Sequence, residues 1–212
     1  DGGDGRRLVC EQPMSIDAKP YSEACEQNKD PILQVLREVF IQPGLILEIG
    51  AGTGQHAVHF ARELPHLTWQ PTDLAVHLPG IRLWLAEACL ANLQAPLALD
   101  ACQEPWPVTQ AAGVFSANTA HIMAWPMVEY LFRGVGRMLE SGGMFCLYGP
   151  FNYDGQYTSP SNAAFDAWLR TRDPASGIRD FADLDRLARN NGLRLLQDHA
   201  MPVNNRTLIW VR

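Results

Sequence analysis

The sequence is poor in lysine and has no long apolar run. Lys19 and Lys29 are its only lysines, and 23 acidic residues outnumber 17 basic ones without a basic cluster anywhere. A nucleic-acid-binding protein normally carries a basic stripe that neutralises phosphates, so nucleic acid is not an expected partner. The longest apolar runs reach about six residues, whereas a membrane-spanning helix needs about eighteen or more. We therefore expect no membrane contact.

Paired cysteines are also missing. The five cysteines are odd in number, and none belongs to a C-x-x-C pair. This pattern argues against a disulfide framework and against a zinc knuckle, and it favours a reducing, cytoplasmic setting. Residues 1–20 are expected to form a flexible amino-terminal tail, because the Gly-rich, charged start has no apolar segment typical of a secretory signal. Residues 21–212 are long enough for a single domain.

What the sequence does contain is a regular alternation of helical and extended patterns. Short apolar runs bounded by glycine are typical of strands buried on both faces, and helices between them imply right-handed crossovers. The fold expected is α/β, a Rossmann-like, doubly wound and mostly parallel sheet that ends in an antiparallel hairpin. The first helix is expected to begin at Asn28-Lys29-Asp30-Pro31, with proline in its first turn. The strands are expected over 45–49, 67–71, 96–99, 114–117, 144–148, 193–199 and 207–211, and the later helices over 55–64, 81–91, 127–139, 163–172 and 181–190.

The sharpest motif joins the first strand to the second helix. Glu48-Ile49-Gly50-Ala51-Gly52-Thr53-Gly54 places three glycines where the backbone can approach a ligand beside free helical N–H groups. The dinucleotide pattern G-x-G-x-x-G would need glycine at position 55, where the chain has glutamine. A tight turn of purely structural value is the alternative interpretation of this loop.

Polar residues follow the next strands at the same edge of the expected sheet. Asp73, about twenty residues after the loop, suits a ribose diol. Asp100 suits an adenine amino group, with Leu74 and Ala101 beside the ring, although either aspartate could simply cap a turn. His56 is expected to border the same ligand. His56 and His59 lack a carboxylate at metal-ligand spacing, so no metal site is expected.

The chain resembles class I methyltransferases that use S-adenosylmethionine (SAM), and more narrowly the small methyltransferase-like protein 26 family. The resemblance rests on Ala24–Leu33, Leu47–His56, Leu147–Phe151, Gly177–Asp180 and Met201–Asn205. It implies a seven-stranded sheet with SAM, and the product S-adenosylhomocysteine, across its carboxyl edge. It also implies contacts of the methionine part with Glu48, Gly50, Gly52 and Gly54, of the ribose with Asp73, of the adenine with Asp100 and Ala101, and of the ammonium with Asn118.

Candidate acceptor-site residues come from the ends of the fourth and fifth strands. His121 is the candidate general base, because it is the imidazole expected at the ligand edge of the sheet; a simple hydrogen bond to a loop is the alternative. Aromatic residues in the polar loop after Gly149 suit a lid over a small, partly apolar substrate. The expected substrate contacts are Tyr21, His121, Trp125, Tyr148, Phe151 and Tyr153.

The segment 21–29 precedes the first expected strand and carries polar groups that need partners. We expect it to lie over the methionine end of SAM, with Tyr21 and Asn28 as contacts. The alternative is a helix that only covers the sheet.

Methyl transfer from SAM to oxygen, sulfur or nitrogen of a small-molecule acceptor is the function these patterns favour. A SAM-binding partner or regulatory protein without its own transfer activity is the alternative. An NAD-linked oxidoreductase is disfavoured by the missing third glycine and by the terminal hairpin. A monomer or homodimer is expected.

Overall fold

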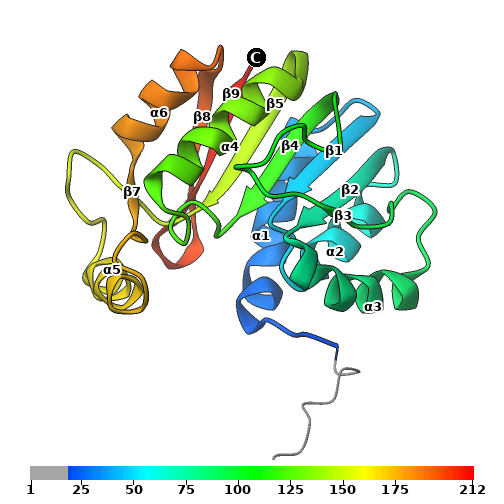
Figure 1. The fold of residues 1–212 in the computed structure, drawn as a ribbon, viewed down its shortest axis with the longest axis horizontal. Helices are drawn as coiled ribbons and strands as arrows, with labels where there is room; N and C mark the ends of the chain where they lie inside the picture. The colour runs from blue at the N-terminus through cyan, green and yellow to red at the C-terminus, as the bar shows by residue number, and fades with distance from the viewer. Residues whose placement is uncertain (1–18) are drawn as a thin grey trace, which may run out of the picture.

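The computed structural model describes residues 19–212 (Figure 1). The predicted tail falls mostly on residues 1–18, which lie outside the described residues. Its last two residues pack on the domain: the Lys19 ammonium lies 3.5 Å from the centre of the Trp84 ring, and Trp84 Nε1 donates to the Pro20 carbonyl at 2.6 Å. No helix within residues 19–212 combines the length and apolar character that crossing a membrane requires.

Seven strands form the main sheet, in the order β3-β2-β1-β4-β5-β9-β8. Neighbouring strands are parallel except at β9, which runs antiparallel to both β5 and β8. The predicted doubly wound, mostly parallel sheet with an antiparallel terminal hairpin is therefore confirmed. The strands are β1 (Gly44–Ile49), β2 (Leu67–Asp73), β3 (Leu97–Ala98), β4 (Ala111–Ala117), β5 (Leu139–Gly149), β8 (Arg194–Met201) and β9 (Asn205–Val211).

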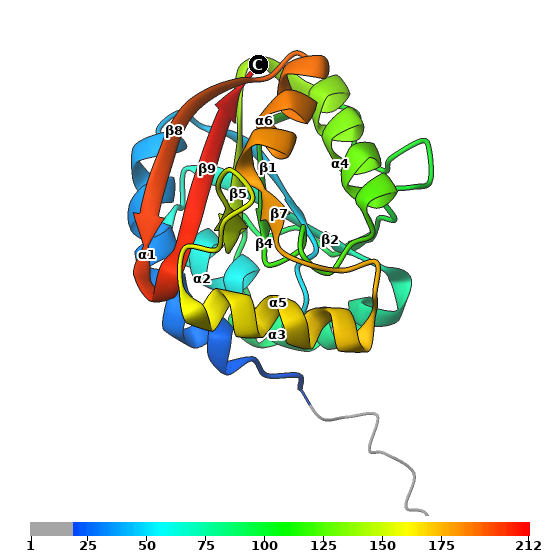
Figure 2. The ribbon, with the colours of Figure 1, turned by 90° about the vertical axis from the view of Figure 1, so that its left-hand side faces the viewer.

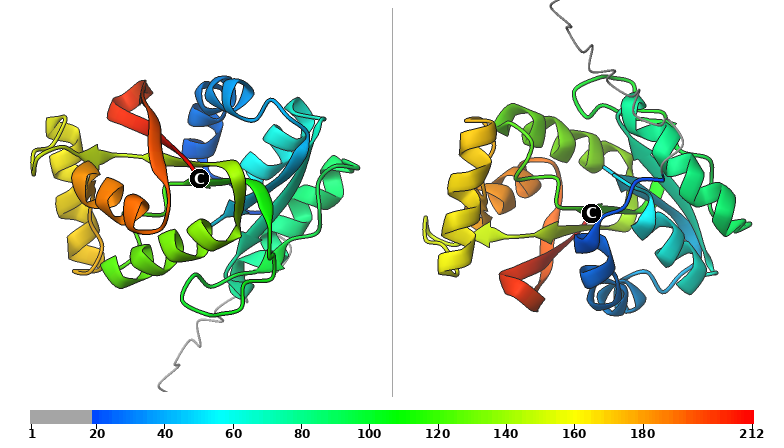
Figure 3. Two further views of the ribbon diagram at one scale, coloured as in Figure 1. Left: turned by 90° about the horizontal axis from the view of Figure 1, so that it is seen from above. Right: turned by 90° about the horizontal axis from the view of Figure 1, so that it is seen from below.

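Helices cover both faces of this sheet (Figures 2 and 3). One face packs against α1 and α2, and the other against α4 and α6. The remaining helices lie near the carboxyl ends of the parallel strands, where α5 and α3 face each other across the lower edge in Figure 1. The helices are α1 (Glu23–Val39), α2 (Gln55–Glu63), α3 (Leu78–Ala88), α4 (Trp125–Met138), α5 (Pro160–Arg172) and α6 (Phe181–Asn190), with short 3₁₀ turns η1 (Ala75–His77) and η2 (Pro202–Asn204).

The central strands are apolar on both faces, as their continuous hydrophobic runs predict. In β5, Phe145 and Leu147 belong to the core beneath α4 and α6, where Phe132 also lies. Cys146 points to the opposite core with Phe60 of α2. All five side chains are fully buried. Successive side chains of a strand alternate between faces, so such a run can be buried only between two layers of helices.

The first helix begins earlier than predicted. Ser22, not Asn28, is its N-cap, and Ser22 Oγ accepts a hydrogen bond from Cys25 N at 3.3 Å. Pro31 therefore lies inside the helix rather than in its first turn. A proline there has no N–H to donate and normally disturbs a helix. Contacts between the first turns of α1 and α2, described below, hold the helix across this position.

A small second sheet, which the sequence analysis missed, organises the loop after β5. Strand β6 (Phe151–Asn152) pairs in parallel with β7 (Arg179–Asp180), on either side of α5. The expected polar lid loop therefore starts as a strand next to the core. The part that faces the carboxyl edge of the main sheet is α5 (Figure 2).

Candidate functional site

A cavity of about 910 Å³ opens at the carboxyl edge of the sheet, within the roughly 300–1,000 Å³ typical of small-molecule sites. Seen from below in Figure 3, α3 and α5 lie on opposite sides of this edge with the start of α1 between them. Two parts of its wall differ in chemistry. We call residues 50–53, 73–74 and 99–101 the glycine-loop half, and the wall made by Ile122, Met123, Phe165, Trp168, Leu169 and Val203 the α5 half.

The glycine loop is fixed by backbone hydrogen bonds. Gly50 N and Ala51 N both donate to the Thr72 carbonyl at 3.0 Å, which ties the loop to the end of β2. Gly52 has φ +59°, and a Cβ atom added there would meet nothing within 4 Å, so this position faces open space. Gly54 is different: an added Cβ would lie 3.2 Å from Ile81 Cγ2 of α3. Gly52 thus keeps the cavity open, whereas Gly54 lets α3 pack closely.

Asp73 at the end of β2 joins this loop to the cavity wall. Its Oδ2 accepts from Gly52 N at 2.6 Å, and its Oδ1 accepts from Leu74 N and pairs with His77 Nδ1, both at 2.7 Å. A carboxylate has about four acceptor positions, so three are used within the protein. Asp73 is 7% exposed and lines the cavity, which leaves its remaining acceptor position for a ligand.

Asp100, Ala101 and Leu74 also line the glycine-loop half. Asp100 accepts from Cys102 N at 2.9 Å and from Gln103 Nε2 at 3.2 Å, so it does cap a turn. It nevertheless lies in the cavity wall beside two apolar side chains, an arrangement suited to a ring with a polar edge.

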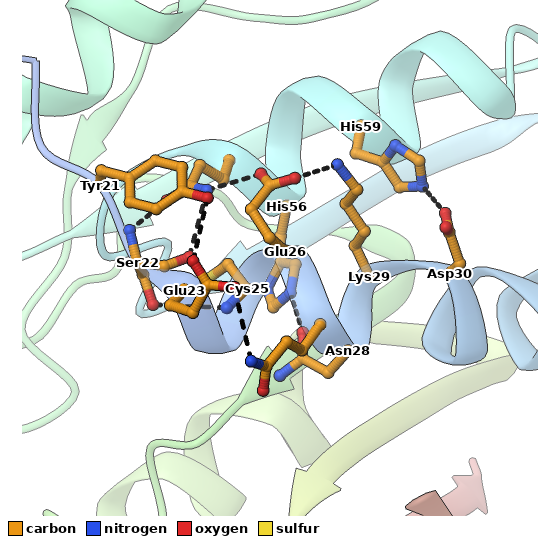
Figure 4. A network of polar contacts seen from close by, with 12 residues as sticks. Tyr21, Ser22, Glu23, Cys25, Glu26, Asn28, Lys29, Asp30, His56 and His59 are labelled. Atoms are coloured by element: carbon orange, nitrogen blue, oxygen red, sulfur yellow. Dashed lines mark hydrogen bonds and ion pairs between the residues drawn. The ribbon is translucent and has the colours of Figure 1, made fainter.

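The start of α1 is held over the glycine loop by side chains of α2 (Figure 4). Gln55 Oε1 accepts from Ser22 N at 2.6 Å, and Gln55 Nε2 donates to Glu26 Oε1 at 2.7 Å. His56 Nε2 lies 2.7 Å from Asn28 Oδ1. Burial lowers the pKa of His56 to about 4, so the ring is neutral near pH 7. Asn28 and His56 both line the cavity.

The turn after β4 supplies the polar groups between the two halves. Ser116 Oγ donates to the Ile49 carbonyl at 2.7 Å and lies 2.7 Å from Thr119 Oγ1, which satisfies both hydroxyls inside the protein. Asn118, which lines the cavity, adopts φ +57° and donates its N–H to the Tyr148 carbonyl at 2.9 Å. The tyrosine side chain lines the cavity as well.

His121 lies in the cavity wall next to the α5 half. Its ring makes an edge contact with Phe165, with 5.3 Å between the ring centres. Within residues 19–212, neither ring nitrogen has a hydrogen-bond partner in the protein. Burial, together with the charge of Arg179, lowers the pKa of His121 to about 4. The ring is thus neutral near pH 7 and has a nitrogen free to accept a proton or hydrogen bond.

The structure does not bring every predicted cofactor residue to the cavity. Glu48 is 2% exposed and accepts a hydrogen bond from Trp69 Nε1 at 2.7 Å beneath the loop. Burial raises its pKa to about 8, so its carboxyl is mostly protonated near pH 7. Tyr21 is 61% exposed, and its hydroxyl faces Glu23 instead of the cavity. Gly54 serves helix packing, as described above.

Three predicted substrate aromatics also lie elsewhere, and for Phe151 and Tyr153 the reason is that β6 directs their segment toward the core. Phe151 is 1% exposed within the core beneath α4 and α6. Tyr153 stacks on Phe181 and donates its hydroxyl to Asp198 Oδ2 at 2.8 Å. Trp125 packs on the same core and borders a separate cavity of about 410 Å³. Tyr148 and His121 are the predicted substrate residues that line the large cavity.

Sequence reasoning missed the contribution of α5. Phe165, Trp168 and Leu169 line the cavity from this helix, together with Ser161 and Asn162 of its first turn. The spacing 165, 168, 169 is the i, i+3, i+4 pattern of one helical face. That signal was present in the sequence, but nothing in it specified whether this face meets the sheet or a ligand cavity.

The family described as "protein of unknown function (DUF938)" matches residues 19–212. This chain belongs to that family. Solved structures share its fold. A putative O-methyltransferase from Nostoc punctiforme matches the DUF938 chain with a TM-score of 0.78 at 21% identity, over 89% of this chain and 56% of that chain. The SAM-dependent methyltransferase SibL matches this chain with a TM-score of 0.76 at 24% identity, over 89% of this chain and 55% of that chain.

Human N-acetylserotonin methyltransferase, solved in complex with SAM, matches with a TM-score of 0.72 at 16% identity, over 90% of this chain and 53% of that chain. The DUF938 chain spans just over half the length of the structures it matches. At these identities the likeness establishes the fold alone, which this chain shares with these methyltransferase structures.

Proposed function

We propose that this protein is a SAM-dependent methyltransferase that acts on a small molecule. The observation that carries the proposal is the junction of Gly52 and Asp73: the glycine faces open cavity, and its N–H is bonded to a carboxylate that also lines that cavity. Other glycines with positive φ, such as Gly142, also face open space, but Gly52 faces this cavity. The narrower resemblance to the methyltransferase-like protein 26 family belongs to this proposal.

The glycine-loop half fits SAM part by part. Gly50 and Gly52 would lie along the methionine part, and the free acceptor position of Asp73 suits a ribose hydroxyl. Leu74 and Ala101 would contact the adenine ring, with Asp100 at its amino group. Asn118, Asn28 and His56 would border the methionine end, where the first turns of α1 keep water out and strengthen polar contacts.

SAM supplies an already activated methyl group, so the protein's main contribution is to orient the acceptor in line with it. The acceptor atom forms its bond to the methyl carbon while the carbon–sulfur bond breaks and leaves its electron pair on sulfur. The acceptor's proton goes to the free nitrogen of the neutral His121 ring, which then releases it to water. The cavity continues past His121 into the α5 half, which favours transfer over the alternative of a protein that only binds SAM.

Isothermal titration calorimetry of the whole chain with SAM, S-adenosylhomocysteine and NAD tests the proposal. We expect saturable binding of the first two and none of NAD. Binding of NAD in place of SAM would support an oxidoreductase, and absence of SAM binding would contradict the proposal. SAM binding without release of S-adenosylhomocysteine across a panel of phenols, thiols, acids and amines would favour a partner or regulatory role.

The same proposal places the protein in a reducing, cytoplasmic environment with a small molecule as its partner, as a monomer or homodimer. The four cysteines of the described region are free, which supports a reducing setting. Residues 21–212 would then act as one methyltransferase domain.

A further inference from the structure

The α5 half of the cavity has a composition that selects its ligand by charge. Its wall consists of Ile122, Met123, Phe165, Trp168, Leu169 and Val203. Several of these apolar side chains are unusually accessible: Ile122 is 58% exposed, Trp168 50% and Val203 78%. Exposed large apolar groups gathered around one cavity mark a binding surface, because each of them loses contact with water when a ligand covers it.

No lysine or arginine lines the cavity within residues 19–212. The guanidinium groups near this wall already have partners within the protein, and that of Arg172 lies over the Trp168 ring, 4.9 Å from its centre. Arg179 donates to the carbonyls of Ala120 (3.1 Å), Met123 and Ala175 (2.9 Å), and Arg170 pairs with Asp166 at 2.8 Å. A carboxylate, phosphate or sulfate bound against the α5 half would therefore lose its hydration without gaining a counterion from the wall, which is strongly unfavourable.

The α5 half also has no carboxylate to receive a cation. Asp166 is on the same helix, but its oxygens accept from Arg170, from the Tyr157 hydroxyl at 2.7 Å and from Ile178 N at 2.6 Å. The two aspartates that line the cavity, Asp73 and Asp100, belong to the glycine-loop half. An uncharged ligand is what this wall accommodates.

The shape of the wall favours a ring. Phe165 and Trp168 lie nearly parallel, with 5.8 Å between ring centres and 18° between their planes, one helical turn apart. Flat molecules gain from offset or edge contacts with such rings beyond the area they bury. His121, with its free ring nitrogen, contacts Phe165 in the cavity, and Ser161 and Asn162 line it from the preceding turn of α5.

We propose that the α5 half is the acceptor subsite and takes an uncharged, ring-bearing apolar molecule whose hydroxyl or thiol points at His121. This inference rests on the proposed function for the reaction, but the selectivity for an uncharged ligand can be measured without it.

Three naphthalene probes with the same ring and different substituents test the proposal with the full chain: 2-naphthol, naphthalene-2-thiol and the anion 2-naphthoate. Affinities are measured by calorimetry at pH 6, where 2-naphthol and the thiol are largely neutral, with and without S-adenosylhomocysteine. We expect 2-naphthol and the thiol to bind at least tenfold more tightly than 2-naphthoate. Equal or tighter binding of 2-naphthoate overturns the proposal.

Two variants locate the probe. Phe165→Ala should weaken the affinity for 2-naphthol at least tenfold and leave the affinity for SAM within about twofold. The control is Tyr130→Ala, which removes a partly exposed aromatic side chain on α4 outside the cavity and should change neither affinity. Ile122→Arg adds the missing counterion at an exposed position. It should shift the ratio of the affinities for 2-naphthol and 2-naphthoate toward 2-naphthoate by tenfold or more. An unchanged ratio in Ile122→Arg, or unchanged naphthol affinity in Phe165→Ala, overturns the assignment.

The two proposals can fail separately. If SAM does not bind but 2-naphthol binds in a Phe165-dependent way, methyl transfer is wrong and the subsite stands. If SAM binds and none of the probes does, the subsite is wrong and the cofactor proposal stands.

Discussion

The two halves of the cavity are built by different means. The glycine-loop half is held by main-chain hydrogen bonds, such as those from Gly50 and Ala51 to the Thr72 carbonyl, and by the fixed carboxylate of Asp73. The α5 half presents side chains, Phe165 and Trp168 among them, with few polar groups. A backbone cradle requires particular residues at particular spacings, whereas an apolar wall accepts many combinations. The first therefore leaves a motif in the sequence, and the second does not.

The largest expected effect lies between the two halves, at His121. A positioned general base typically contributes about 10²- to 10⁴-fold to a rate. His121→Gln should therefore slow formation of S-adenosylhomocysteine by about that factor with the best acceptor of the phenol and thiol series, while SAM affinity measured by calorimetry stays the same. An unchanged rate would leave this ring with a structural role.

Glu48, buried beneath the glycine loop, should make the stability of the fold decrease as pH rises from about 5 to 8. Its folded pKa of about 8 is raised above the unfolded value, so the protonated form stabilises the fold at low pH, and this contribution is lost as pH rises through about 8. The expected loss is roughly 3 kcal/mol of unfolding free energy between pH 5 and 8. Urea titrations of the wild type and Glu48→Gln should show a clearly flatter profile in the variant. Parallel profiles would contradict the buried, protonated carboxyl.

Gly52→Val tests whether the loop glycine serves the ligand. The side chain would enter open cavity, and we expect SAM affinity to fall roughly hundredfold or more, which corresponds to about 2.7 kcal/mol. Gly142→Val is the matched control, because Gly142 also has positive φ and open space but does not line the cavity. Both variants should lose similar stability from backbone strain, and only the first should lose SAM. Normal affinity in Gly52→Val would mark this glycine as structural.

Asp73→Asn should cost about 1.5 to 3 kcal/mol of SAM binding, because a hydrogen bond to a charged group is replaced by one to a neutral group. Calorimetry should show a roughly tenfold to hundredfold weaker affinity, and circular dichroism an unchanged fold. A SAM affinity equal to that of the wild type would contradict the assignment of Asp73 to the ribose. Affinity for 2-naphthol should not change, because Asp73 belongs to the other half of the cavity.

The smallest expected effect concerns a residue that the sequence placed at the substrate. Tyr153→Phe removes the hydroxyl bonded to Asp198 and should lower the unfolding free energy by about 1 kcal/mol in urea titrations. It should leave the rate of methyl transfer and the affinity for 2-naphthol as they are, because Tyr153 packs against α6 and the core. A loss of methyl-transfer activity without a loss of stability would instead support a role for Tyr153 in the acceptor site.

Much of the fold could be predicted, because the central strands are short apolar runs next to a glycine and several helices end at a proline or glycine. Helix α6 was predicted with its bounds at Phe181 and Asn190, where Asp180 caps one end. The start of α1 was wrong because Asn28 to Pro31 satisfies the local rules for an N-cap. Those rules cannot show that Gln55, on another helix, extends α1 back to Glu23.

The residues of the candidate site also divide into those that a local sequence pattern could predict and those that it could not. The sequence predicted polar residues at the ligand edge because they follow the ends of predicted strands. Asp73 and Asp100 of the glycine-loop half, and Asn118 beside it, do line the cavity. Their roles toward SAM stay predictions. Phe151 and Tyr153 were misplaced because the pairing of β6 with β7 brings together segments more than twenty-five residues apart, which no local pattern reveals.

The strand order of the sheet has a consequence for synthesis at the ribosome. β9 follows β8 in the sequence, yet it lies between β5 and β8 in the sheet, and it is the neighbour to which β8 pairs. The strands up to β5 can pair as soon as they emerge, whereas β8 must wait without a partner for the final strand. Until then, β5 presents an open hydrogen-bonding edge of the kind that invites aggregation. The main sheet is completed only after β9 has been synthesised.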